Sequence, residues 1–199
     1  MKKESYKKIS VVGIFAIAMA FVETLIVVYL RMLYYPLGFR FPLNLYIDSW
    51  VYSIEWLREF FTIVMLVCIA ILAAKKFSER FAYFLYVFAV WDIFYYIWLK
   101  IILNWPESLL TWDLLFLIPI PWLGPVLAPV ICSIIMIVFA LIIINFNDKG
   151  YNAEIKLKEW IVLFMGGLII LYTWLIDYAK LIFGKGFKSD FFNLLVNWL

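Results

Sequence analysis

Charged side chains interrupt the apolar stretches of this sequence, and they are its clearest candidates for chemistry. Glu23, Glu59 and Asp92 each lie within a long apolar stretch. An isolated charge at the centre of a membrane helix costs at least about 2.5 to 3.5 kcal/mol, so such groups face one another or water. Intramembrane carboxyl groups are also typical of proton relays. The pattern therefore predicts a polar cavity within the membrane, with proton binding at one of these three carboxyls.

The depth of the charges predicts that this cavity opens outward. At 1.5 Å per helical residue, Asp92 lies roughly 17 Å from the start of its stretch at Phe81, near the middle of a hydrocarbon core about 30 Å thick. Other charges lie farther out by the same count, and aromatic residues flank Asp92. The predicted cavity residues are Glu23, Arg31, Glu55, Arg58, Glu59, Trp91, Asp92, Tyr95, Lys100, Glu107, Asp113 and Asp177.

Structural alternatives stay open for the same residues. Buried charges can pair between helices simply to fix their register, and Arg58 between Glu55 and Glu59 can form a self-contained cluster. The aromatic side chains can instead form an interfacial belt. Asp92 has no basic residue three or four positions away. It therefore needs Arg58 or another donor from a neighbouring helix, or else a proton.

Composition predicts the elements that must position these residues. The chain has 199 residues, of which 67% are hydrophobic, 21% aromatic and 16% charged, and its mean hydropathy is +1.00. Soluble domains are about half apolar, so we expect one integral membrane domain over residues 1–199. The sequence has no histidine, which excludes His-ligated haem, His-containing zinc sites and His-based triads. We expect no cofactor or metal, and Cys68 and Cys132 are interpreted as small buried hydrophobes.

Five apolar stretches have the length of a spanning helix, which is about 20 residues. The predicted fold is all-α, a polytopic membrane helix bundle of about five transmembrane helices at 9–30, 54–74, 81–103, 126–146 and 160–183. The C-terminal sequence FKSDFFNLLVNWL places polar residues at i+4 spacing. It is predicted to form an amphipathic helix on the outer leaflet.

The stretch LTWDLLFLIPIPWLGPVLAP, residues 110–129, is apolar but holds four prolines. Proline costs about 3 kcal/mol or more inside a helix. Asn104, Pro106 and Glu107 resemble a helix start. We therefore predict a short, non-spanning helix over 105–118 that is re-entrant or interfacial and ends at the prolines. The alternative is a loop packed on the outer end of the bundle.

Basic residues predict the orientation. The loops on the N-terminal side carry ten basic and five acidic residues, whereas the rest of the chain carries seven and nine. Loops rich in Lys and Arg stay in the cytoplasm. We therefore expect a cytoplasmic N-terminus and a C-terminus outside the cell.

Three motifs carry a resemblance to a known family. They are VETLIVVYLRMLYYP near the start, WDIFYY in the middle, and WPESLLTWDLLFLIPIPWLGP after it. Together they resemble a family of small prokaryotic multi-pass membrane proteins to which no activity is assigned. The resemblance covers roughly residues 20–130 and implies a prokaryotic inner membrane.

Three functions fit these observations. The first is binding or transport of a small polar or amphipathic ligand, coupled to protons. The second is a non-catalytic subunit or assembly partner of a larger membrane complex. The third is an outer-leaflet enzyme that uses Glu59 and Asp92 as acid and base on a lipid-linked substrate. The expected partners are the lipid bilayer and either further copies of the chain or other membrane subunits, with no nucleic acid.

Overall fold

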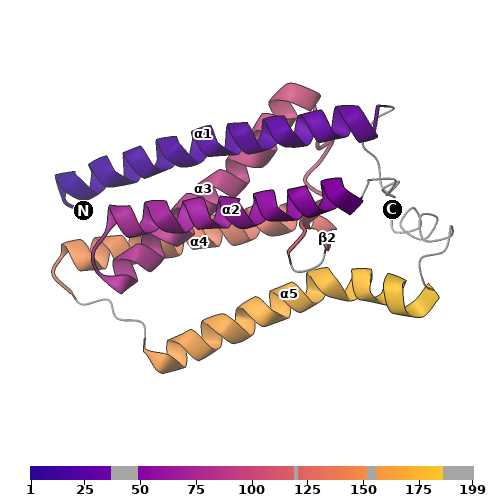
Figure 1. Cartoon of the computed structure of the whole chain (residues 1–199). Coiled ribbons are helices and arrows are strands. Elements are labelled where there is room, and N and C mark those ends of the chain that lie inside the picture. The colour runs from indigo at the N-terminus through magenta and orange to yellow at the C-terminus, as the bar shows by residue number, and fades with distance from the viewer. Residues whose placement is uncertain (37–48, 119–120, 152–155, 186–199) are drawn as a thin grey trace.

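The computed structural model describes residues 1–36, 49–118, 121–151 and 156–185. Five long helices and one two-stranded sheet make up this part of the chain (Figure 1). In chain order they are α1 (Lys3–Tyr34), α2 (Ser49–Ala73), α3 (Phe77–Leu103), β1 (Trp112–Phe116), β2 (Trp122–Pro125), α4 (Leu127–Asp148) and α5 (Leu157–Lys185). All five helices are long and apolar enough to cross a membrane. The predicted helical bundle is therefore confirmed, and its helices match the predicted stretches to within a few residues at most ends.

Helix α3 is the centre of the bundle, and it packs against α1, α2 and α4. Small residues make these close approaches feasible: Ala16 and Ala20 of α1 and Ala82 and Ala89 of α3 are fully buried. A Cβ added to Gly13 would lie 2.8 Å from the Tyr86 hydroxyl oxygen, so a larger residue here would require the end of the Tyr86 side chain to shift.

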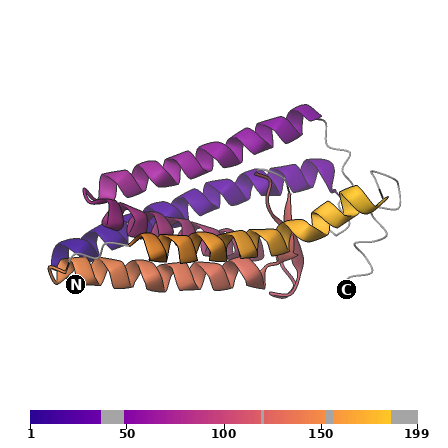
Figure 2. The ribbon, with the colours of Figure 1, turned by 90° about the horizontal axis from the view of Figure 1, so that it is seen from below.

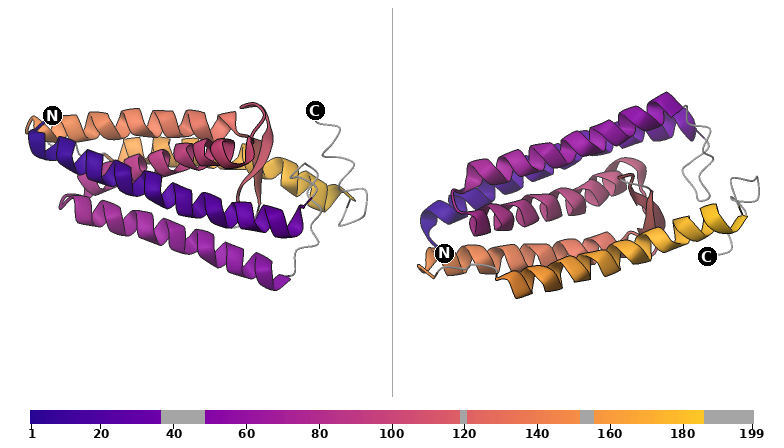
Figure 3. Two further views of the ribbon diagram at one scale, coloured as in Figure 1. Left: turned by 90° about the horizontal axis from the view of Figure 1, so that it is seen from above. Right: turned by 60° about the horizontal axis from the view of Figure 1, so that its bottom comes forward.

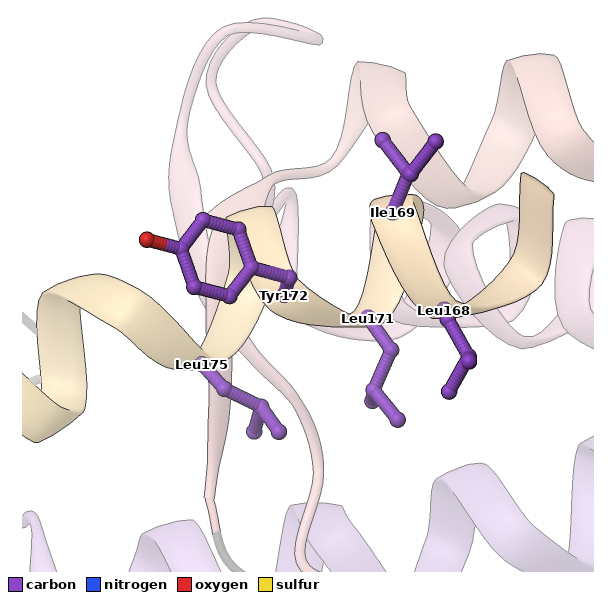
Figure 4. Close-up of a pocket in the computed structure, with 5 residues that line it drawn as sticks. All are labelled: Leu168, Ile169, Leu171, Tyr172 and Leu175. Atoms are coloured by element: carbon purple, nitrogen blue, oxygen red, sulfur yellow. The ribbon is translucent and has the colours of Figure 1, made fainter. Parts of the chain in front are cut away.

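Helix α5 lies at the edge of the molecule, apart from α1 and α2 (Figures 1 and 3). Its main contact with the rest of the chain is β2, where the rings of Trp174 and Trp122 lie 5.7 Å apart. No residue of its apolar window is buried. A shallow apolar hollow on its surface is lined by α5 residues alone (Figure 4).

The segment between α3 and α4 corrects the prediction, because no helix forms at 105–118. Strands β1 and β2 instead pair antiparallel, with Asp113 opposite Gly124 and Leu114 opposite Leu123. The strands cross the bundle at the end where α3 stops and α4 begins (Figure 2). We call this end of the bundle the hairpin end.

Hydrogen bonds to the start of α4 explain why strands replace the helix. The Leu127 N–H donates to Leu109 O at 2.7 Å, and the Val126 N–H donates to Thr111 O at 3.0 Å. The first N–H groups of a helix lack partners within the helix, and here carbonyls before β1 accept from that region. A helix over 105–118 would have used those carbonyls itself.

Three further expectations have different outcomes. Cys132 is partly buried, but Cys68 is exposed on α2, so the prediction that both are buried is wrong for Cys68. The amphipathic C-terminal helix was predicted beyond Lys185 and lies outside the described residues. The orientation in the membrane stays a prediction.

Candidate functional site

The described polar and charged residues at the hairpin end form a set that we call the polar cluster. Its members are Glu23, Arg31, Glu55, Arg58, Glu59, Asp92 and Asp113. They come from α1, α2, α3 and β1. All of them are among the predicted cavity residues, and the structure gives each one a defined partner.

Arg58 connects α1 and α2. Its guanidinium pairs with the Glu23 carboxylate of α1 and with the Glu55 carboxylate one turn earlier on α2, where the Arg58 Nε donates to Glu55 Oε2 at 2.8 Å. The Thr62 hydroxyl lies 3.2 Å from Glu23 Oε2 and donates to it. These side chains therefore link α1 to α2, whose backbones approach each other at few points.

Glu59 does not complete the Arg58 cluster but points to the chain after β1. One of its carboxylate oxygens accepts the backbone N–H of Leu117 at 2.8 Å. Both residues are buried, with 7% of Glu59 and 5% of Leu117 exposed. A buried backbone N–H without an acceptor is costly. The hydrogen bond between Glu59 and Leu117 therefore holds the hairpin against α2.

Arg31, in the last turn of α1, pairs with a residue of β1. Its Nη2 lies 3.6 Å from Asp113 Oδ1, and its guanidinium carbon lies 4.0 Å from the centre of the Trp105 ring. Only 1% of Asp113 is exposed. Burial raises the pKa of Asp113 to about 6, although Arg31, the Leu114 N–H and the Tyr96 hydroxyl each act to lower it.

Asp92 finds its partner on α4. The hydroxyl of Ser133, a fully buried residue, donates to Asp92 Oδ2 at 2.8 Å. The expected donor from a neighbouring helix is thus Ser133, and Arg58 is occupied by Glu23 and Glu55. Sequence analysis missed Ser133 and Thr62. The sequence showed these two residues only as hydroxyl side chains inside apolar stretches, which is a weak indication of a functional site.

The remaining predicted residues have separate surroundings. Trp91 is buried and its ring meets Phe88 edge to face, while Tyr95 packs against Tyr96 in the same manner. The Lys100 ammonium donates to backbone oxygens of Asn104 and Pro106. Glu107 is exposed. The side chain of Asp177 lies outside what the structure describes.

Charge in the polar cluster is unbalanced. Its carboxyl groups outnumber its guanidinium groups, and the Lys100 ammonium is bonded to backbone oxygens. Within the described residues, no group of three His, Cys, Asp or Glu side chains has the arrangement of a metal site. The apolar hollow on α5 contains none of the predicted site residues. The arrangement is thus suited to protons or to a ligand with a positive group.

Comparisons with known proteins add no relative: no protein-family model matches the chain, and neither does any curated protein or solved structure. The family resemblance of the sequence motifs stays a prediction.

Proposed function

We propose that this chain is a multi-pass protein of a prokaryotic inner membrane that binds or transports a small polar or amphipathic ligand together with protons. The observation that supports this proposal is the excess of carboxyl over guanidinium groups in the polar cluster. Unneutralised carboxylates in apolar surroundings are costly. The surplus groups therefore take up protons or bind a positively charged group.

The same excess favours a ligand that carries a positive charge. A bound amine would replace protons on the surplus carboxyls, because both neutralise the same groups. Binding of the ligand and release of protons would then be linked. We place the hairpin end at the outer face of the membrane, since the basic loops lie at the opposite end of the bundle.

The test uses purified protein in liposomes that contain a pH-sensitive dye. Amines, neutral polyols and small carboxylic acids are added outside, and the internal pH is followed. We expect a protein-dependent pH change with an amine. Asp92→Asn, which keeps the size of the side chain, should abolish it, because the variant removes one titratable carboxyl.

The matched control is Glu4→Gln, an exposed carboxyl at the other end of α1. It should behave like the unaltered protein. A response equal to that of empty liposomes for every compound would refute the proposed function. A fully active Asp92→Asn variant would show that Asp92 has no part in the proposed function.

A second function, a subunit of a larger membrane complex, is supported by α5. This helix presents its apolar window unburied and contacts mainly β2. Purification from native membranes in a mild detergent tests it. A second chain in fixed proportion would support the subunit role, and a pure single-chain species would oppose it.

The enzyme hypothesis needs Glu59 and Asp92 to act on one substrate as a pair. Glu59 accepts from Leu117 and Asp92 accepts from Ser133, so the two carboxyls are bound to different elements. This geometry does not favour them as an acid–base pair.

A further inference from the structure

Helix α5 begins beside the start of α3, at the end of the bundle opposite the hairpin (Figure 1). The ring centre of Trp160 lies 4.8 Å from that of Phe81 and 6.0 Å from that of Phe77. Trp160 lies in the first turn of α5, and Phe77 is the first residue of α3. These ring contacts therefore bring together the basic segments at the starts of the two helices, residues 75–76 and 156–158.

Four lysines occupy these two segments, and all of them are exposed: Lys75, Lys76, Lys156 and Lys158. None of the four forms an ion pair with another residue in the part of the chain that the structure describes. The acidic residue in the first turn of α5, Glu159, accepts the backbone N–H of Lys156 at 2.6 Å. The lysine ammonium groups therefore form a positively charged surface that attracts anions.

An apolar surface continues from these lysines along α5. None of the residues 161–173 is buried. A Cβ added to Gly166 or Gly167 would have no atom within 4 Å, so no other described part of the chain approaches these glycines closely. The leucine side chains that line the apolar hollow point to one side of the helix (Figure 4). The middle of α5 thus presents a surface of the kind that lipid acyl chains cover, because these chains are as apolar as leucine.

We propose that the start of α3 and the length of α5 form a binding site for an anionic phospholipid. The lipid phosphate contacts the four lysines, and the acyl chains lie on the apolar surface of α5. Charge and apolar surface follow one another along α5 in the order in which a phospholipid carries them. A basic residue near the membrane surface strengthens the binding of anionic lipid by about fivefold. Trp160 beside the lysines fits this placement, since tryptophans are enriched at the level of the headgroups.

Other occupants match this surface less well. In a symmetric dimer the same patch of both copies meets at the contact, so the lysines of one copy would face those of the other and repel them. Free phosphate would bind the lysines but leave the apolar surface of α5 uncovered. A phospholipid satisfies both parts of the site, and this inference goes beyond the proposed function without depending on it.

Native mass spectrometry of the purified protein in detergent tests the proposal. The probes are phosphatidylglycerol, which is anionic, and phosphatidylcholine with the same acyl chains, which carries no net charge. We expect phosphatidylglycerol to bind at least about tenfold more tightly. The double variant Lys156→Gln, Lys158→Gln should lower the affinity for phosphatidylglycerol by about twenty-fivefold, or fivefold per lysine, and leave that for phosphatidylcholine unchanged.

The matched control is the double variant Lys3→Gln, Lys7→Gln. It removes the same charge from exposed positions on α1, at the same end of the bundle, and it should bind phosphatidylglycerol like the unaltered protein. The proposal is overturned if the two phospholipids bind equally well to the unaltered protein. It is also overturned if the two double variants lose the same affinity, because the effect would then reflect net charge alone.

A photoreactive phosphatidylglycerol locates the site without any substitution. Its cross-links should fall on α5, and glycerol 1-phosphate, which has the charge but no acyl chains, should not reduce them. Cross-links that fall elsewhere, or that glycerol 1-phosphate abolishes, would refute a lipid site on α5. A second protein chain cross-linked along α5 in native membranes would refute it as well, because the apolar surface would then belong to a protein partner.

Discussion

The Glu59 carboxylate on α2 accepts the backbone N–H of Leu117 at 2.8 Å, although 58 residues separate the two in the chain. Arg31 of α1 pairs with Asp113 of β1 in the same hairpin. Two charged side chains from two helices thus hold the hairpin against the bundle. The position of the hairpin is therefore coupled to the charges of the polar cluster.

The first prediction follows from the bond between Glu59 and Leu117. Glu59→Leu leaves the buried Leu117 N–H without an acceptor, which should lower the free energy of unfolding by about 1 to 3 kcal/mol. Glu59→Gln keeps a carbonyl oxygen and should lose less. Chemical unfolding in detergent measures both, and equal stability of Glu59→Leu and the unaltered protein would contradict this role.

The second prediction concerns Arg58. Arg58→Met removes the partner of Glu23 and of Glu55, and stranding a buried charge costs about 3 to 5 kcal/mol. The loss should be smaller at low pH, where the stranded carboxyls can take up protons. Lys8→Met is the matched control, because Lys8 pairs with Glu4 at 3.2 Å on the exposed surface and should contribute little. Unfolding midpoints that are equal for the two variants would contradict the prediction.

The third prediction is a dependence of stability on pH. Burial raises the pKa of Asp113 from 3.8 to about 6. The folded protein then binds more protons than the unfolded chain between these two values, so this contribution to stability is complete below the lower value and is lost as the pH rises through about 6. Asp113→Asn should flatten the fall in unfolding free energy over this range. A slope unchanged from that of the unaltered protein would show that Asp113 titrates normally.

The fourth prediction concerns orientation. In a variant with Cys68 and Cys132 replaced by alanine, a single cysteine is introduced at Lys76, Lys149 or Glu107, which are all exposed. A membrane-impermeant thiol reagent added to intact cells should label only the cysteine at 107. External labelling at 76 or at 149 would reverse the orientation.

The sequence predicts the charged residues of the site better than their partners. Glu23, Arg58 and Asp92 are visible because a charge in an apolar stretch is costly and needs a reason. Ser133 carries no such signal, since a hydroxyl can bond within its own helix. Which helices are neighbours decides that Ser133 meets Asp92, and apolar periodicity alone does not contain that information.

The sequence by itself determined the five helices, because a chain this apolar must bond every backbone group internally, and a long uninterrupted apolar stretch does so only as a helix. Tertiary structure alone decided the secondary structure of residues 105–118. Trp112–Phe116 has a pattern compatible with a helix, yet it pairs with Trp122–Pro125 and its neighbouring carbonyls accept from the start of α4. A strand needs a partner that lies elsewhere in the chain, so its stability depends on contacts that local sequence does not encode. The same contacts bury Asp113 beside Arg31, and this burial raises the pKa of Asp113.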